Sequence, residues 1–262
     1  MTKTILITGA TDGIGLLTAQ NLAAEGHIVL LHGRNPDKLK AAAAKVGGTT
    51  EQFIADLTDL GDVRAMAAAI REKHSQIDVL LNNAGILKAP KAITKDGYDI
   101  RFMVNTIAPY VLTKELLPII AKEGRIVNLS SAAQAKIDLS ALRGEHQLSD
   151  MDAYAQSKLA ITIWSREMAK DLPDGPAVIA VNPGSLLASK MVKEGFGVAG
   201  NDLGIGAGIL REAALGNDFA GASGKYFDND SGQFAQPNAA ALDQSHREDV
   251  MQTLQEIAAK LS

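Results

Sequence analysis

The 262-residue sequence contains no cysteine, which excludes disulfide bonds and thiolate catalysis. No apolar run reaches the roughly 18 residues that a membrane-spanning helix requires. The first residues lead directly into an apolar run, without the pattern of a signal peptide. The net charge is −4, so electrostatic binding to nucleic acid has no support. These absences predict a cytoplasmic, enzyme-sized protein with neither nucleic acid nor a membrane as partner.

Metal ligands are also scarce, because the five histidines show no metal-ligand spacing and the acidic residues form no obvious bridging pair. We therefore predict no catalytic metal and interpret the histidines as core or surface residues. His146 is the one histidine for which a substrate contact stays open.

Hydrophobic residues make up 46% of the chain and charged residues 21%, as in globular proteins with a sizeable core. Apolar strand-like runs alternate with helical patterns, which is typical of βαβ units with right-handed crossovers. The pattern predicts a single α/β domain, 1–262, built on a parallel sheet. The predicted strands are 5–7, 27–32, 51–56, 77–81, 125–129, 176–181 and 224–227, and the predicted helices are 14–25, 36–46, 60–73, 98–122 (broken near Pro109 or Pro118), 152–171 and 246–261.

A glycine turn follows the first predicted strand, with glycines at positions 9, 13 and 15. Glycine lets the backbone approach a pyrophosphate, and the first N–H groups of the following helix favour negative charge. The spacing is Gly-x-x-x-Gly-x-Gly and predicts a phosphate site. An ordinary tight connection between a strand and a helix is the alternative.

The second predicted strand ends in Gly33-Arg34-Asn35, and no acidic residue lies between His27 and Pro36. An acid near this point would bind a ribose 2′-hydroxyl, whereas an arginine suits a 2′-phosphate. We therefore predict that NADP(H) is preferred over NAD(H), with Arg34 on the 2′-phosphate. A solvated surface arginine is the alternative.

Tyr154 and Lys158 stand four residues apart on a predicted helix and so share a face. A nearby ammonium favours the phenolate, and this argument predicts that Lys158 lowers the pKa of Tyr154. Tyr154 would then exchange a proton with a carbonyl or alcohol oxygen. Chance matches to this spacing are common, and a pair of surface residues is the alternative.

Other polar residues stand at strand ends. Asn82-Asn83-Ala84-Gly85 follows the fourth predicted strand, and its small residues would let a cofactor approach the backbone. Ser130 and Ser131 end the fifth predicted strand, where serines also serve as turn residues. Asn105 stands inside a predicted helix, a locally unfavourable place that suggests a specific role.

These motifs occur in one order along the chain: TGxxxGIG, NNAG, Asn105, SS, YxxxK and Pro183-Gly184. In this arrangement the sequence resembles the short-chain dehydrogenase/reductase family. The resemblance implies a Rossmann-type, doubly wound parallel sheet of about seven strands in the order 3-2-1-4-5-6-7. It also implies hydride transfer to or from a nicotinamide, and frequent homo-oligomers.

The resemblance assigns catalysis to Asn105, Ser131, Tyr154 and Lys158. Ser131 would donate to the substrate oxygen, and Asn105 would hold a water that hydrogen-bonds the lysine. Many members that prefer NADP carry a basic residue at the place of Asp12, which is a counter-signal. The predicted cofactor-binding residues are Gly9, Thr11, Asp12, Gly13, Ile14, Gly15, Arg34, Asn35, Asp56, Leu57, Asn83, Ala84, Gly85, Tyr154, Lys158, Pro183 and Gly184.

Two stretches depart from the family pattern. An insertion at about 136–151 resembles that of the retinol-dehydrogenase-like branch, and we expect it to wall the substrate pocket. Ala188 stands where the family often has Thr or Ser for the carboxamide, with Ser189 next to it. The glycine-rich stretch 186–208, which includes Phe196, is predicted to be a mobile loop that closes over substrate.

Together these observations predict an NADP-dependent oxidoreductase that interconverts a small-molecule alcohol and a carbonyl. A non-catalytic nucleotide-binding regulator with the same fold is the alternative, although it would not need all four catalytic residues. A dehydratase or epimerase of the same superfamily is disfavoured, because the chain lacks room for a sugar-nucleotide domain. Substrate, direction and oligomeric state stay open.

Overall fold

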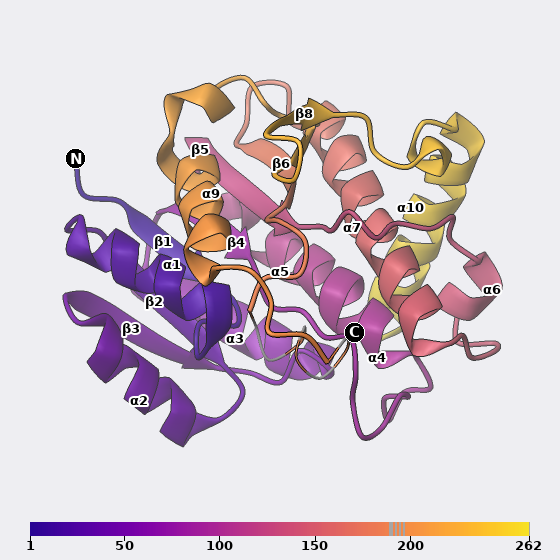
Figure 1. Ribbon diagram of the computed structural model, residues 1–262, viewed down its shortest axis with the longest axis horizontal. Coiled ribbons are helices and arrows are strands. Elements are labelled where there is room, and N and C mark those ends of the chain that lie inside the picture. Colours follow the sequence, from indigo (N-terminus) through magenta and orange to yellow (C-terminus); the bar gives the residue numbers. More distant parts are fainter. Residues whose placement is uncertain (189–190, 192, 194, 196, 262) are drawn as a thin grey trace.

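The computed structural model describes residues 1–188, 191, 193, 195 and 197–261. Its strands are β1 (Thr4–Ile7), β2 (Ile28–Gly33), β3 (Thr49–Ile54), β4 (Ile77–Asn82), β5 (Ile120–Leu129), β6 (Ala177–Asn182), β7 (Tyr226–Asp228) and β8 (Gln233–Ala235). They form one sheet in the order β3-β2-β1-β4-β5-β6-β7-β8 (Figure 1). The first seven pair in parallel and confirm the predicted order, whereas β8 is an antiparallel addition to β7.

Helices cover both faces of the sheet, because alternate strand residues point to opposite sides. Leu6 belongs to the hydrophobic core under α3, α5, α7 and α10, whereas Ile5 and Ile7 belong to the core under α1, α2 and α9. The helices are α1 (Gly13–Ala24), α2 (Pro36–Val46), α3 (Leu60–Lys73), α4 (Ile100–Phe102), the π-helix η1 (Met103–Ile107), α5 (Ala108–Leu116), α6 (Leu139–Leu142), α7 (Asp150–Asp171), α9 (Leu203–Leu215) and α10 (Gln244–Lys260), with 3₁₀ turns η2 (Leu117–Ile119), η3 (Asn217–Phe219) and η4 (Ala239–Ala241).

The predicted helix 98–122 is divided into α4, η1, α5 and η2. Pro109 lies in the first turn of α5, where its missing N–H group costs little. The helical path ends with η2, which contains Pro118, and β5 begins at Ile120. The break near the prolines is confirmed, but the helical assignment of 120–122 is wrong.

The predicted loop 186–208 is shorter than expected, because α9 already begins at Leu203 and Asp202 caps it by accepting from the Gly204 N–H. A Cβ atom on Gly206 would lie 2.5 Å from Leu187 Cδ1 and 2.9 Å from Ile14 Cγ2. The glycine there permits close packing of α9 beside α1 rather than mobility (Figure 1). The residues at positions 189, 190, 192, 194 and 196 of this stretch lie outside the described residues. They include Ser189 and Phe196 of the predicted loop.

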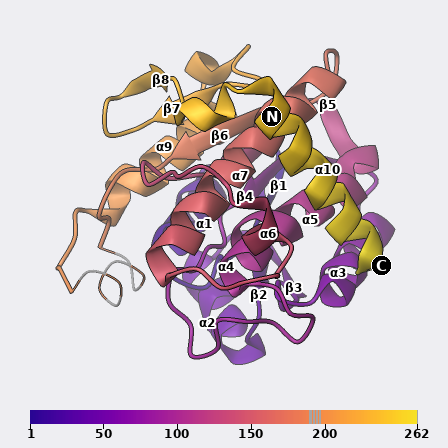
Figure 2. The ribbon, with the colours of Figure 1, turned by 90° about the vertical axis from the view of Figure 1, so that its right-hand side faces the viewer.

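The insertion 136–151 contains α6, whose Ala141 and Leu142 are buried beside α10. Arg143 Nη2 donates to Thr253 Oγ1 of α10 at 3.0 Å. Figure 2 shows the β7–β8 hairpin at the top of the molecule and α2 at the bottom. Among the described residues, no helix is long and apolar enough to cross a membrane.

Candidate active site

The turn between β1 and α1 depends on glycine. Gly9 and Gly13 have φ values of +66° and +55°, in the left-handed region. A Cβ atom on Gly15 would lie 2.4 Å from the Gly9 carbonyl oxygen and 2.4 Å from the Asn83 amide nitrogen, so a larger residue does not fit. Asp12 is the N-cap of α1, but its side chain makes no cap hydrogen bond. The first N–H groups of α1 are thus left without side-chain capping and suit phosphate oxygens.

Asn83 and Thr8 fasten the segment after β4 to this turn. Asn83 Nδ2 donates to the carbonyl oxygens of Thr8 at 2.8 Å and Gly9 at 3.1 Å. Thr8 Oγ1 accepts from the N–H groups of Asn83 and Ala84, both at 3.0 Å. Asn83 Oδ1 is buried and accepts no hydrogen bond from the described residues. A bare backbone wall with an unpaired buried acceptor fits a dinucleotide, whose ribose hydroxyls can donate.

His32 supports the glycine turn, a role that the sequence argument missed. The Gly9 N–H donates to His32 Nδ1 at 3.2 Å, so the ring proton lies on Nε2, which is 3.1 Å from the Ala55 carbonyl oxygen. Burial lowers the pKa of His32 to about 4, so the ring is neutral at physiological pH. A buried polar residue at the end of an apolar strand was the available signal.

The end of β2 lies against the same turn, since a Cβ atom on Gly33 would lie 2.5 Å from Thr11 Cγ2. Arg34 follows directly and is exposed. Asn35 caps α2 by accepting from the Lys38 N–H at 2.9 Å, so its side chain already serves the helix. Contact of the exposed Arg34 guanidinium with a 2′-phosphate stays a prediction.

Asp56 lies two residues beyond β3, because that strand ends earlier than the sequence predicted. Its Oδ1 atom accepts from the N–H and hydroxyl groups of Thr58 at 3.0 and 2.9 Å, which forms a local turn. Leu57 is buried. Contact of either residue with an adenine stays a prediction.

Tyr154 lies in α7 and is half-buried, and the side chain of Ser131, which follows β5, lies close enough to the phenol to influence its pKa. The two serines after β5 have different surroundings. Ser130 is buried, and its hydroxyl donates to the Lys158 carbonyl oxygen at 3.0 Å. Ser131 is half-buried, and Tyr226 Oη donates to its carbonyl oxygen at 3.1 Å. The structure therefore brings Ser131, and not Ser130, to the phenol.

Lys158 lies one helical turn after Tyr154 and is buried. Its Nζ donates to the Leu129 carbonyl oxygen at 2.7 Å and lies 5.7 Å from the centroid of the Tyr154 ring. A Cβ atom on Gly85 would lie 3.4 Å from this Nζ and 3.6 Å from Asn105 Oδ1. The NNAG segment thus passes directly beside the ammonium group. We call the backbone surface formed by residues 9–15 and 82–85 the glycine cradle, and Lys158 lies at its wall.

The model of the short chain dehydrogenase family matches residues 3–196 of the sequence. The chain belongs to the short-chain dehydrogenase family. Human retinol dehydrogenase 13 is 33% identical over 251 residues, which cover 86% of this chain and 76% of the human protein. The new member is therefore an oxidoreductase of a family that uses NAD or NADP, as its sequence motifs predicted.

Solved structures agree with this assignment. An uncharacterised protein from Mycobacterium paratuberculosis superimposes with a TM-score of 0.82 at 28% identity, over 98% of this chain and 93% of that protein. A blue fluorescent protein from a metagenomic library, crystallised with NADPH, superimposes with a TM-score of 0.70 at 25% identity, over 88% of this chain and 97% of that protein.

One electrostatic prediction for this short-chain dehydrogenase is wrong. Burial raises the pKa of Tyr154, and the hydrogen bond with Ser131 opposes this rise without overcoming it. Lys158 is not among the causes of this shift, and its Nζ donates to the Leu129 carbonyl oxygen. Burial also lowers the pKa of Lys158 to about 8. Tyr154 is consequently protonated at neutral pH and is suited to donate a proton.

Asn105 lies in the π-helix η1, an irregularity that is frequent at functional sites. Its Oδ1 accepts from the Ile86 N–H at 2.8 Å, and its Nδ2 donates to the Ile86 carbonyl oxygen at 3.0 Å and to Ser157 Oγ at 2.9 Å. The side chain thus joins the segment after β4 to α7. A water held between Asn105 and Lys158 stays a prediction.

The Pro183-Gly184 turn follows β6, and Gly184 has a φ of +121°. Asn229 Nδ2 donates to the Pro183 carbonyl oxygen at 2.9 Å. Ala188 N–H donates to the Asn201 carbonyl oxygen at 2.7 Å, so its backbone is engaged within the loop. Asn229 follows β7, so the hairpin that the sequence only partly predicted supports this turn.

His146 of the insertion faces Asp138, with its Nε2 3.2 Å from Asp138 Oδ2, and both side chains are exposed. No contact of His146 with the residues around Tyr154 is found in the part of the chain that the structure describes. Within the same described residues, no group of three or more His, Asp or Glu side chains could hold a metal ion.

Proposed function

We propose that this short-chain dehydrogenase is an NADP-dependent oxidoreductase that interconverts an alcohol and a carbonyl. The observation that carries the proposal is the placement of Tyr154 and Lys158 on one face of α7, with Lys158 Nζ 5.7 Å from the centroid of the Tyr154 ring and directly beside Gly85. The glycine turn before α1 supports it, because its backbone geometry suits a pyrophosphate.

Each side chain then has a distinct task. The protonated phenol of Tyr154 donates a hydrogen bond, and finally its proton, to a carbonyl oxygen. Ser131 donates a second hydrogen bond to the same oxygen and so stabilises its developing negative charge. Lys158 presents an ammonium group to the wall of the cradle, where ribose hydroxyls can accept from it. The reduced nicotinamide, when bound, supplies the hydride.

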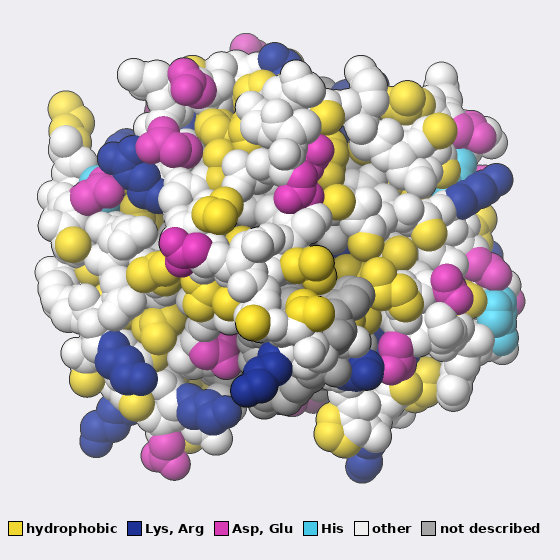
Figure 3. Space-filling view, viewed as in Figure 1, with side chains coloured by type: hydrophobic (Ala, Val, Ile, Leu, Met, Phe, Trp, Pro, Cys, Tyr) yellow, Lys and Arg dark blue, Asp and Glu magenta, His cyan; other side chains and the backbone are white. Residues whose placement is uncertain are grey.

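The substrate proposed is largely apolar. Leu186, Val198 and Ile205 lie on the segment after β6 with exposed fractions of 45%, 43% and 51%. Hydrophobic side chains also gather in the middle of the face that this segment crosses (Figure 3). The human relative is named for retinol, an apolar alcohol, and this likeness points in the same direction. An extended apolar aldehyde or ketone is the substrate class that we expect.

A panel of aldehydes and ketones, incubated with NADPH or with NADH, tests the function. We expect oxidation of NADPH in the presence of apolar carbonyls, which is measured as the loss of the reduced-nicotinamide absorbance. Tight binding of NADPH without oxidation across the whole panel would contradict the proposal and favour a non-catalytic nucleotide-binding protein.

Cofactor choice gives a prediction at Arg34. Arg34→Asp removes the guanidinium and places a carboxylate beside the ribose, so KM for NADPH should rise about tenfold or more, while KM for NADH should stay the same or fall. Lys40→Asp makes the same charge change on the exposed side of α2 and is the control. Equal effects of the two variants on KM for NADPH would refute a direct contact between Arg34 and the 2′-phosphate.

A further inference from the structure

A buried arginine stands beside the start of α7. Arg101 is 1% exposed, and its guanidinium makes a two-pronged ion pair with Asp99, with Nε 2.8 Å from Oδ1 and Nη2 2.6 Å from Oδ2. Its Nη1 donates to Asp150 Oδ1 at 2.5 Å. Asp150 is the first residue of α7, so Arg101 joins the segment before η1 to the helix that carries Tyr154.

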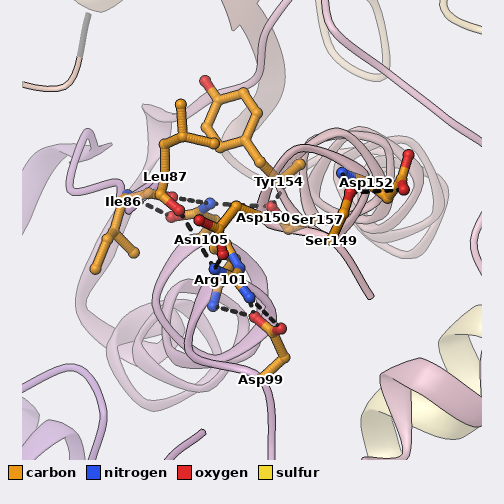
Figure 4. Close-up of polar contacts among 10 residues, drawn as sticks. All are labelled: Ile86, Leu87, Asp99, Arg101, Asn105, Ser149, Asp150, Asp152, Tyr154 and Ser157. Atoms are coloured by element: carbon orange, nitrogen blue, oxygen red, sulfur yellow. Dashed lines mark hydrogen bonds and ion pairs between the residues drawn. The ribbon is translucent and has the colours of Figure 1, made fainter. Parts of the chain in front are cut away.

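A second link lies one turn along the same helical segment. Asn105 Nδ2 donates to Ser157 Oγ, and Ser157 Oγ donates to the Tyr154 carbonyl oxygen at 2.7 Å. Figure 4 shows the two links together, with Arg101 and Asn105 reaching residues of α7 on either side of Tyr154 along the chain. The links at Asp150 and Ser157 therefore bracket the tyrosine.

The two links differ in whether the sequence predicted their residues. Asn105 was expected in the site from its resemblance to a family motif, whereas neither Arg101 nor Asp150 was. Arg101 is fully buried while the Asp150 side chain is 50% exposed, so the guanidinium is held by Asp99 and reaches outward to the helix. A planar guanidinium binds two carboxylates in fixed directions, which makes it a rigid connection.

We propose that Arg101 is a positioning residue that acts through Asp150 to hold the first turn of α7, and with it the phenol of Tyr154. The proposal rests on the proposed function, in which Tyr154 is the proton donor. First turns of helices open readily, because their N–H groups lack partners within the helix. The link to Arg101 anchors this turn to the buried side of the site, one turn before Tyr154.

The first turn of α7 provides a matched pair of variants. Asp150 and Asp152 are both acids in this turn, but only Asp150 contacts Arg101. Asp152 Oδ2 accepts from the hydroxyl of Ser149, the N-cap of the helix. Asp150→Ala and Asp152→Ala each remove one charge from the same helix end, so a difference between them reports the link to Arg101. Arg101 itself is left unchanged, because its replacement would leave the Asp99 carboxylate buried and unpaired.

Two readouts are measured on the full chain with NADPH. We expect Asp150→Ala to lower kcat about tenfold, with the Kd of NADPH unchanged, because a small displacement of the proton donor slows chemistry and not binding. Hydrogen–deuterium exchange of the amides of 153–158 should become about tenfold faster. Asp152→Ala should change each value less than twofold.

Equal kcat values for Asp150→Ala and the wild-type chain would overturn the positioning role, even with faster exchange. Equal exchange in the two variants would overturn the link itself. The exchange readout does not need turnover, so a wild-type chain that reduces no carbonyl would refute the proposed function while exchange still decides whether Arg101 holds the Tyr154 segment.

Discussion

Tyr154→Phe is expected to lower kcat about a thousandfold, because the variant loses the proton donor to the substrate oxygen. Its Kd for NADPH should stay within twofold of the wild-type value. The phenyl ring keeps the shape of the side chain, and the lost hydroxyl lies beside Ser131. Steady-state kinetics and a fluorescence titration with NADPH measure the two quantities.

Tyr110→Phe is the control for this variant. Tyr110 of α5 packs edge-on against Trp164 of α7, with ring centroids 5.9 Å apart, in the hydrophobic core. Loss of its hydroxyl should leave kcat within twofold of the wild-type value. A Tyr154→Phe variant that kept more than a tenth of the wild-type kcat would remove Tyr154 from the role of proton donor.

Lys158→Met has the second largest expected effect on activity. It removes the ammonium from the wall of the cradle, so kcat/KM for NADPH should fall about a hundredfold. In the wild-type enzyme the same quantity should decline above about pH 8, because burial lowers the pKa of Lys158 to about 8. A wild-type profile that stays level from pH 7 to about pH 10, beyond that pKa, would contradict this role.

The same variant should be more stable than the wild-type chain at neutral pH. A pKa lowered from 10.5 to about 8 means that burying the charged lysine costs about 3 kcal/mol. Loss of the hydrogen bond to the Leu129 carbonyl oxygen offsets about 1 kcal/mol of this, so the free energy of unfolding should rise by about 2 kcal/mol. Denaturant unfolding at pH 7 measures the difference.

The pH dependence of stability shows the sign of the contribution that Lys158 makes to the free energy of unfolding. The unfolded lysine keeps its proton up to about pH 10.5, whereas the folded one releases it near pH 8. The contribution of Lys158 therefore makes the wild-type free energy of unfolding rise between these pH values, and Lys158→Met should lack that rise. Lys170→Met, at an exposed position of α7, is the control and should behave as the wild-type chain. If Lys158→Met were less stable than the wild-type chain at pH 7, the buried charge of Lys158 would not destabilise the fold.

Much of the fold was predictable, because the strands and helices carry local signals, whereas the order of the strands in the sheet came from the family resemblance. Buried parallel strands read as continuous apolar runs, and Pro36 with Asn35 marks the start of α2. The antiparallel β8 was missed, because Gln233–Ala235 has only three residues and is too short to carry a strand pattern. The start of α9 was missed because its glycines read as a loop, although Gly206 is there for close packing against Ile14.

The meeting of the glycine turn and the NNAG segment was predictable from their positions after strands. Asn83 and Gly15 meet because the two segments follow the neighbouring strands β4 and β1. The direction of the Tyr154 pKa shift was not predictable. It depends on burial and on where Lys158 Nζ points, and neither is encoded in a four-residue spacing. Arg101 was missed for the same reason, since its partner Asp150 is distant in sequence.

The central claim is that Tyr154 protonates a carbonyl oxygen while NADPH delivers hydride to the carbonyl carbon. The most direct test is the transfer of deuterium from C4-deuterated NADPH to the carbinol carbon of the product. Mass spectrometry measures this transfer. We expect deuterium at that carbon in the wild-type product and about a thousandfold slower appearance of the same product with Tyr154→Phe. A wild-type product without deuterium, or an equal rate in the variant, would contradict the account.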